Sequence, residues 1–273
     1  MMKKAITGLL FFLIMATACL AGQNMEDRVY YVNKVGMKFI LIKEGDFMMG
    51  SPSDVAERDA NEKQYRVTIK NPFYIQTTEV TQGQWKSVMG YNPSFFRDCG
   101  DECPVEQVSW YEVQEFIKRL NREENSDTLE GTRKYRLPTE AEWEYVARAG
   151  TTSFFNTGNC LLTTEANYNG NFPLNKCPRG EYRVKPFPVG SFPANAWGLY
   201  DIHGNVSEWV QDWNGRYPEG QATDPAGPAE GTGKIFRGGS WSHDAWSCRS
   251  AIRYAGSANG SENYLGFRLM RLF

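Results

Sequence analysis

The residues of this 273-residue chain that could do chemistry are its two histidines, His203 and His243, and its six cysteines. Neither histidine belongs to a nucleophile elbow, and the chain has no phosphate-binding loop. No Cys-x-x-Cys motif or histidine cluster supplies the ligand spacing of a zinc site. These residues therefore predict no familiar catalytic centre and no required cofactor.

Thiol chemistry depends on how the cysteines pair. Cys99 and Cys103 are close in sequence, as are Cys160 and Cys177, and in an oxidising compartment we predict that each pair forms a disulfide closing a small loop. Cys248 is then left over, either as a buried apolar residue or as a reactive nucleophile.

The N-terminus predicts export. Two lysines precede an apolar run, 5–18, which is too short to be taken as a membrane-spanning helix. Ala-Thr-Ala stands directly before Cys19 and resembles a relaxed bacterial lipobox, so we predict a signal peptide over 1–18 and a lipid anchor on Cys19. The alternative is ordinary cleavage after Ala21 or Gly22. Lipidation would place the protein in the bacterial cell envelope, at the outer membrane or cell surface.

Composition predicts one loop-rich globular domain. Hydrophobic residues make up 41% of the chain and aromatic residues 14%, enough for a substantial core, and 26 glycines and 13 prolines favour many turns. The formal net charge is only -2, without a basic stripe, so nucleic acid is not an expected partner. We expect a polar lead over 19–33, a single domain over 34–273, and a monomer.

Short strands and capped helices must position the reactive residues. Stretches rich in aromatic and β-branched residues, bounded by Gly, Pro or Asn, predict strands at 38–42, 47–49, 65–69 and 73–75. Ser109 and Thr139 are each followed three residues later by Glu, which is the capping-box pattern, and amphipathic runs after them predict helices over 109–120 and 139–149. A shorter helix is predicted over 81–89.

Seven ordered motifs between Lys34 and Leu269 resemble the formylglycine-generating enzyme, or sulfatase-modifying factor, family. The first combines the stretches that begin at Met37 and Gly45, and the others begin at Thr78, Pro104, Tyr135, Gly198, Arg237 and Leu265. The resemblance implies an α+β fold of the C-type-lectin-like kind, loop-rich, with two main helices and twisted antiparallel sheets.

The family's enzymes oxidise a substrate cysteine with a copper-binding cysteine pair that follows the Gly-Gly-Ser turn. Here the first of those positions, three residues after Ser240, is His243, and Cys248 aligns better with a structural segment. Because Cu(I) prefers thiolate ligands, the sequence predicts a protein that is not an enzyme. A divergent oxidase with a His/Cys copper pair remains the alternative.

One non-enzymatic branch of the family matches this chain in its C-terminal placement of motifs. It comprises the variable proteins of diversity-generating retroelements, in which adenines near the 3′ end of the gene are randomised. Here Gly238-Gly-Ser-Trp241 and Leu265-Gly-Phe-Arg268 enclose a short segment, 241–264, that we predict to be a variable ligand-binding surface. The alternative is a polar surface loop without a ligand.

The segment is rich in residues that suit adaptable recognition, including Ser, Asn, Tyr and His. We predict ligand contacts in two patches: Trp241, Ser242, His243, Asp244, Ala245 and Ser247, and then Tyr254, Ala255, Ser257, Ala258 and Asn259. Trp246, Cys248, Ile252 and Phe267 are expected to be framework. The expected partner is a protein or glycan on another cell or surface.

The resemblance also implies a structural calcium ion. Its ligands would be the side chains of Asp201 and Glu208 and the carbonyls of Gly204 and Val206, oxygen donors suited to a hard cation. The alternative is a tight turn in which Asp201 simply bonds backbone amides. A second family site would involve Asn167, the Tyr168 carbonyl and Glu181.

Three classes of function follow from the sequence. The first is a diversified binding protein, and the second is an envelope lipoprotein with a fixed partner in a secretion or motility assembly. The third is a divergent copper-dependent enzyme. The absence of the cysteine pair favours binding over catalysis.

Overall fold

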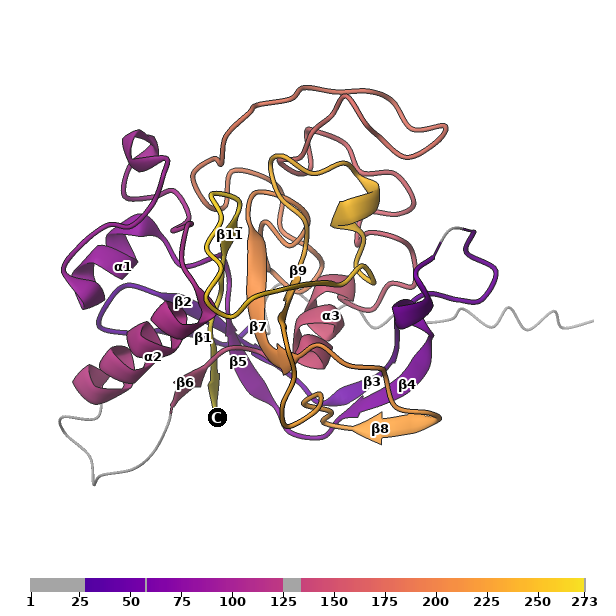
Figure 1. Cartoon of the computed structure of the whole chain (residues 1–273), viewed down its shortest axis with the longest axis horizontal. Coiled ribbons are helices and arrows are strands. Elements are labelled where there is room, and N and C mark those ends of the chain that lie inside the picture. Colours follow the sequence, from indigo (N-terminus) through magenta and orange to yellow (C-terminus); the bar gives the residue numbers. More distant parts are fainter. Residues whose placement is uncertain (1–27, 57, 125–133, 273) are drawn as a thin grey trace, which may run out of the picture.

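The computed structural model describes residues 28–56, 58–124 and 134–272 (Figure 1). The predicted signal peptide and Cys19 lie outside these residues. Within this part of the chain, no helix combines the length and apolar character needed to cross a bilayer.

A five-stranded sheet brings the two ends of the domain together, in the order β1-β2-β5-β12-β6. Its strands are β1 (Tyr30–Val32), β2 (Lys38–Ile42), β5 (Phe73–Gln76), β6 (Tyr135–Arg136) and β12 (Met270–Leu272). β12 pairs with both β5 and β6, so the last strand lies inside the sheet. The predicted polar lead is wrong at its end, because Tyr30–Val32 pairs with β2 and is part of the domain.

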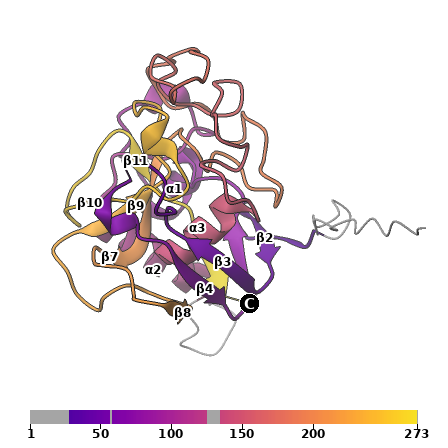
Figure 2. The ribbon, with the colours of Figure 1, turned by 90° about the vertical axis from the view of Figure 1, so that its right-hand side faces the viewer.

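Two further sheets complete the fold, with orders β10-β9-β7-β11 and β3-β4-β8. Their strands are β3 (Gly45–Met49), β4 (Tyr65–Ile69), β7 (Ser207–Trp213), β8 (Gln221–Thr223), β9 (Lys234–Arg237), β10 (Tyr254–Gly256) and β11 (Leu265–Gly266). Most pairings are antiparallel as predicted, but β11 pairs with β7 and β8 with β4 in parallel. Figure 2 shows β3 and β4 in front of α3.

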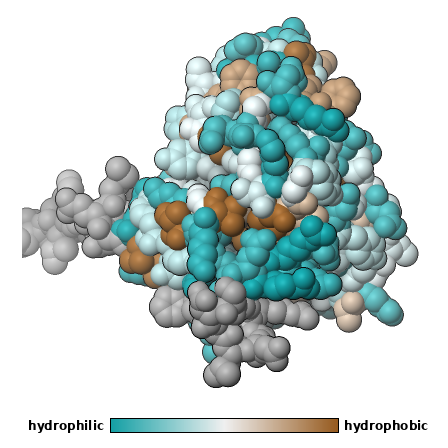
Figure 3. Space-filling view, turned by 90° about the vertical axis from the view of Figure 1, so that its left-hand side faces the viewer, coloured by the Kyte–Doolittle hydropathy of each residue, from teal (hydrophilic) through white to brown (hydrophobic). Residues whose placement is uncertain are grey.

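Three helices, α1 (Gln82–Met89), α2 (Trp110–Glu124) and α3 (Glu140–Arg148), confirm the predicted helical segments. Thr81 and Thr139 form capping boxes at the starts of α1 and α3. Ser109 and Glu112 exchange the same pair of bonds before α2, at 2.8 and 3.3 Å. Hydrophilic residues cover most of the molecular face that carries α1 and α2, and apolar residues form only small areas there (Figure 3).

The apolar side of α2 faces the largest core. Val113, Phe116 and Leu120 are completely buried there, and Phe116 stacks on Trp85 of α1 with ring centroids 5.1 Å apart. A second core lies between α3 and the sheets, around Trp143, Val146 and Val67. Burial of these large side chains supplies the main driving force for the fold.

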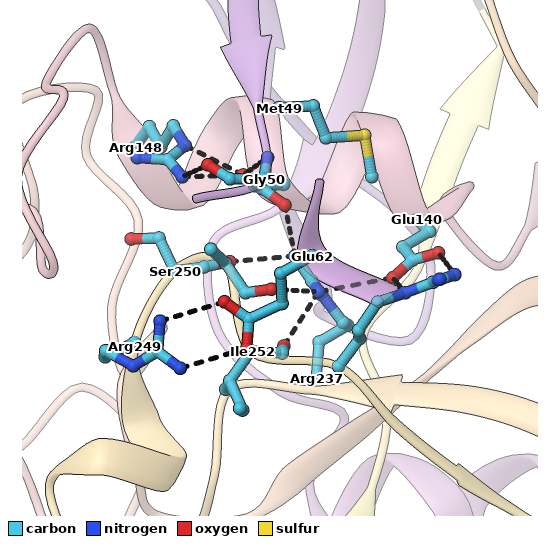
Figure 4. A network of polar contacts seen from close by, with 12 residues as sticks. Met49, Gly50, Glu62, Glu140, Arg148, Arg237, Arg249, Ser250 and Ile252 are labelled. Atoms are coloured by element: carbon cyan, nitrogen blue, oxygen red, sulfur yellow. Dashed lines mark hydrogen bonds and ion pairs between the residues drawn. The ribbon is translucent and has the colours of Figure 1, made fainter. Parts of the chain in front are cut away.

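A buried ion-pair network fixes the segment 249–253 (Figure 4). Arg237, without solvent exposure, binds Glu140 and Glu144 from α3 and the carbonyls of Ser250, Ala251 and Ile252. Arg253 binds Glu140, and Arg249 makes two bonds of 3.0 Å to Glu62. Because buried arginines need charged partners, these contacts specify one path for the chain.

The disulfides are those predicted from the sequence, Cys99–Cys103 and Cys160–Cys177. Cys248 forms no disulfide and is buried, as expected if it is a buried apolar residue. The reactive alternative for this thiol is wrong for the folded protein.

Candidate functional site

The candidate site begins at the turn after β9. Gly238 and Gly239 have φ angles of +91° and +68°, in the left-handed region that glycine adopts at little cost. A Cβ on Gly239 would lie 2.5 Å from the Cys248 sulfur, so this position also needs the smallest residue. The turn then holds Trp241 through its N–H, which donates to the Asn205 carbonyl at 2.9 Å.

An aromatic row lies along this turn and its neighbours. We define it as Phe96, Trp241, His243, Tyr254 and Tyr264. The ring centroids of Phe96 and Trp241 are 5.4 Å apart, and His243 lies 5.9 Å from Tyr254 and 5.1 Å from Tyr264. Trp241 Nε1 also donates to the Asn263 carbonyl at 3.3 Å. All five side chains are half-buried, so each keeps an accessible part.

The row joins the two predicted contact patches. Trp241, Ser242 and His243 of the first patch are half-buried and Asp244 is exposed, and Tyr254 of the second patch stacks on His243. Ala255, Ser257 and Asn259 lie beyond it, and Ala255 and Asn259 are exposed. The structure thus joins the two patches through Tyr254, which contacts His243 and Ser247.

Three predicted contact residues are corrected because their side chains are buried. Ala245 has no exposed surface and packs with Phe155 and Tyr168. Ser247 accepts a 2.8 Å bond from the Tyr254 hydroxyl, and Ala258 belongs to the main core. All three are framework. Among the predicted framework residues, Cys248, Ile252 and Phe267 are buried, whereas Trp246 is half-buried.

Sequence reasoning missed the part of the site that comes from distant segments. Phe96 precedes the first disulfide, and its neighbour Phe95 is 62% exposed. Tyr182 stacks near Trp241, with centroids 6.4 Å apart. Two adjacent phenylalanines shortly before a predicted disulfide were the available signal, since large apolar groups in surface loops often mark contact surfaces.

The two histidines differ in their surroundings. His203 is buried, its Nδ1 contacts the Cys248 carbonyl at 2.8 Å, and its Nε2 accepts a bond from the Asn156 N–H at 3.1 Å. Burial lowers the pKa of His203 to about 4, so the ring is neutral near pH 7. His243 Nδ1 lies 2.7 Å from the Ser240 hydroxyl, and burial also lowers its pKa. Burial raises the pKa of the Cys248 thiol, which disfavours the thiolate.

In the predicted calcium loop, both carboxylate oxygens of Glu208 are hydrogen-bonded, whereas Asp201 keeps one oxygen without a bond from the described residues. Both oxygens of Glu208 bind Arg268 at 2.7 Å, and one also accepts from Trp143 Nε1. Asp201 Oδ2 accepts from the Gly190 N–H at 2.6 Å, while its Oδ1 is buried without a partner among the described residues. The residues therefore fit a cation at Asp201 but not at Glu208, and the tight-turn alternative accounts for Asp201 Oδ2.

A second buried acid, Glu79, lies beside Asp201. Glu79 Oε1 accepts from the Asn205 amide at 3.0 Å, and no described residue bonds its Oε2. Burial raises the pKa of Asp201 to about 6 and raises the pKa of Glu79 well above its usual range.

Asn167 Oδ1, in the second family site, is likewise buried without a partner in this part of the chain, whereas Glu181 is exposed and binds Arg183. In the described residues, no group of three His, Cys, Asp or Glu side chains is placed to hold a metal.

Calcium at these oxygens is therefore a prediction with a simple test. If Ca²⁺ binds at Asp201, a millimolar excess of CaCl₂ added after chelation should raise the melting temperature near neutral pH, because a ligand of the folded state stabilises it. Asp201→Asn should reduce the shift, with an equal concentration of MgCl₂ as the ionic control. Equal melting curves with calcium and chelator would mean that protons alone satisfy the buried acids.

Comparison with known proteins agrees with this fold. Residues 31–272 match the model of the sulfatase-modifying factor enzyme 1-like domain. The chain is 31% identical over 308 residues to the chaperone protein LppX of Paenibacillus barcinonensis, covering 96% of this chain and 98% of that protein. It is 37% identical over 174 residues to the formylglycine-generating enzyme of Bos taurus, covering 60% of this chain but only 43% of that enzyme.

Two solved structures resemble the whole domain. Treponema denticola variable protein 1 superposes with a TM-score of 0.75 at 28% identity, covering 90% of this chain and 99% of its own. PvdO from Pseudomonas aeruginosa gives 0.74 at 26% identity, with 90% and 98% covered. With the family model matched over nearly all described residues, the chain belongs to the sulfatase-modifying factor enzyme 1-like family.

Proposed function

We propose that this protein is a non-catalytic receptor that binds a protein or glycan through the aromatic row and the exposed residues beside it. The observation that carries the proposal is the contact between partly exposed aromatic residues from distant segments, Phe96 with Trp241 and His243 with Tyr254 and Tyr264. Rigid aromatic side chains provide large contact area at low entropic cost, and Asp244, Ser257 and Asn259 add polar contacts.

The division between exposed and buried positions supports a surface that tolerates variation. Asp244, Ala255 and Asn259 are exposed, whereas 248–253 is buried and held by the ion-pair network. Changes at the exposed positions leave these buried contacts intact. The similarity to Treponema denticola variable protein 1 supports the same proposal.

A copper oxidase is disfavoured by the state of the candidate thiol. Cys248 is completely buried against Gly239, and its raised pKa favours the protonated form, whereas copper chemistry needs thiolate. His243, at the other candidate position, packs against the rings of Tyr254 and Tyr264. We propose that this domain carries no oxidase activity and that the predicted anchor at Cys19 holds it, as a monomer, at the bacterial cell surface.

The decisive experiment is to sequence the 3′ end of the gene and its downstream flank from many sibling clones. Diversification predicts substitutions at adenine positions of the codons for accessible residues, 242–244, 255, 257 and 259, beside a near-identical downstream template. The codons for 248–253 should stay constant and serve as the internal control. An unvarying segment without a template would contradict diversification.

A second candidate function, a helper with one fixed envelope partner, is favoured by a specific observation. The similarity to a chaperone protein, LppX, extends over 96% of this chain. In that case the gene segment would not vary, and the same partner would co-purify with the protein from every clone. The aromatic row would then be the docking surface for that partner.

The aromatic row makes a prediction that applies to both candidates. Replacing His243, Asp244 and Tyr254 together with alanine should weaken binding to the identified ligand by at least about 30-fold, since central aromatic contacts commonly contribute about 2 kcal/mol or more. Biolayer interferometry measures the change. The control is a triple alanine variant of Tyr111, Glu115 and Lys118 on α2, and equal affinities for the two variants would exclude the row as the binding surface.

A further inference from the structure

A cavity of about 460 Å³ lies between the start of α3, β4 and the segment 213–228. Its volume falls within the range of small-molecule sites, about 300–1,000 Å³. The segment that covers it includes β8, at the lower edge of the molecule in Figure 1. None of the aromatic-row residues lines it, so the cavity is a separate feature of the molecule.

The walls of the cavity are mainly apolar and aromatic. Tyr65 and Tyr217 form a tilted pair with centroids 4.9 Å apart, and Trp213 and Pro218 add further apolar surface. The fold already places cations against two of these rings: Arg253 lies 4.1 Å from the Tyr217 centroid, and Lys234 lies 3.9 Å from that of Trp213. Electron-rich rings of this kind favour a positively charged or polarised guest.

Two carboxyl groups line the cavity, and they differ in their partners. Glu140 is saturated: it binds Arg237, Arg253 and the Tyr217 hydroxyl. Asp212 is 4% exposed, and its Oδ2 accepts the Glu140 N–H at 2.8 Å. Its Oδ1 receives no hydrogen bond from any described residue, although the side chain borders the cavity. Gly227 lies against this carboxyl, where even a Cβ would come within 3.0 Å of Oδ1.

A carboxylate oxygen that borders a cavity without a protein donor is left to water or to a guest that can donate a hydrogen bond. Arg253 does not fill this role, because its nitrogens are bound to Glu140, Asn61 and Gly215, and Arg216, which also lines the cavity, makes no hydrogen bond to Asp212. A ligand with a cationic head and an apolar body would match both the Asp212 carboxylate and the apolar walls of the cavity. The head would bind Asp212, and the body would pack on the tyrosine and proline walls.

We propose that this cavity is a binding site for a primary alkylammonium group, carried by a small free amine or by a lysine side chain of another protein. The ammonium donates to Asp212 Oδ1, and its alkyl or aryl chain lies against Tyr65 and Tyr217.

The ionisation of Asp212 gives the site a distinctive pH dependence. Burial raises the pKa of Asp212 to about 7. The ionised fraction, and with it the affinity for an ammonium ion, should increase about tenfold between about pH 6 and pH 8. The charged and titratable groups around Asp212 and its cavity are Glu140 and Glu142 of α3, Lys234 of β9, Tyr65 of β4, Arg216 and Tyr217 of the covering segment, and Arg253.

The test is calorimetric titration of the full chain with phenethylammonium chloride and with Nα-acetyl-lysine methylamide, at about pH 6 and pH 8. Phenethyl alcohol, which has the same ring without the charge, is the matched control ligand. We expect the ammonium ligand to bind more tightly than the alcohol at the higher pH, with the advantage reduced about tenfold at the lower pH. Binding of the free amine identifies a small-molecule site, and binding of the lysine derivative alone identifies a site for a partner protein.

Two variants test whether binding depends on the charge of Asp212 or only on apolar packing in the cavity. Asp212→Asn keeps an oxygen for the Glu140 N–H and should weaken ammonium binding at least about tenfold while alcohol binding is unchanged. Ala222→Leu should abolish binding of both ligands by filling the cavity. The proposal is overturned if neither cation binds, if amine and alcohol bind equally, or if the Asn variant keeps full affinity.

Discussion

Replacing Glu144 with glutamine is expected to destabilise the domain by about 3–5 kcal/mol, the usual cost of removing one partner from a buried ion pair. Glu144 has no exposed surface, and its carboxylate binds Arg148, Arg237 and the Gly50 N–H. Glutamine keeps the volume but leaves the two arginines with less negative charge. Urea unfolding near neutral pH measures the loss.

The matched control is Glu115→Gln on α2. Glu115 is partly exposed and pairs with Arg119 at 3.0 Å, and exposed ion pairs of this kind add little to stability. A loss as small for Glu144 as for Glu115 would show that the buried network does not hold 249–253 in place. The expected large difference would instead identify this network as the support of the binding segment.

Replacing Gly239 with alanine should have the second large effect, about 2–5 kcal/mol from backbone strain and overpacking together. The φ angle of +68° disfavours a side chain, and the new Cβ would lie 2.5 Å from Cys248 Sγ and 2.8 Å from the Ser247 carbonyl oxygen. Relief of these contacts would move the turn that carries Trp241 and His243. Thermal and urea unfolding measure the stability, and ligand affinity reports the movement.

The control variant Gly220→Ala measures the cost of backbone strain without steric overlap. Gly220 has a φ angle of +85°, and a Cβ added there would meet nothing within 4 Å. Only the backbone penalty of about 1–2 kcal/mol therefore applies. Equal losses at 220 and 239 would mean that packing around Cys248 plays no part. A greater loss at 239 would confirm that the turn requires glycine for space as well as for conformation.

Local features of the fold were predictable from the sequence because their causes are local. The capping pairs at Ser109 and Thr139 fixed the starts of α2 and α3, and β2 and β4 match the predicted strands residue for residue. The short spacing between cysteines allowed both disulfides to be predicted. The family motifs supplied the overall fold, and the family match bears them out.

Burial within 241–264 could not be predicted from residue type. Ala245 and Ser247 resemble surface residues in composition, but Phe155, Tyr168 and Tyr254 cover them in the folded chain. Glu208 resembles a calcium ligand, yet Arg268, 60 residues later, takes both of its oxygens. These outcomes depend on contacts between distant segments.

The sequence by itself thus determined the local elements, the disulfides and the segment that carries the candidate site. Only the tertiary structure decided which side chains of that segment face outward, that Phe96 and Tyr182 join Trp241, and that Asp212 borders a cavity. The physical reason is that exposure and hydrogen-bond partners are properties of the packed chain, where residues far apart in sequence compete for the same space and the same donors.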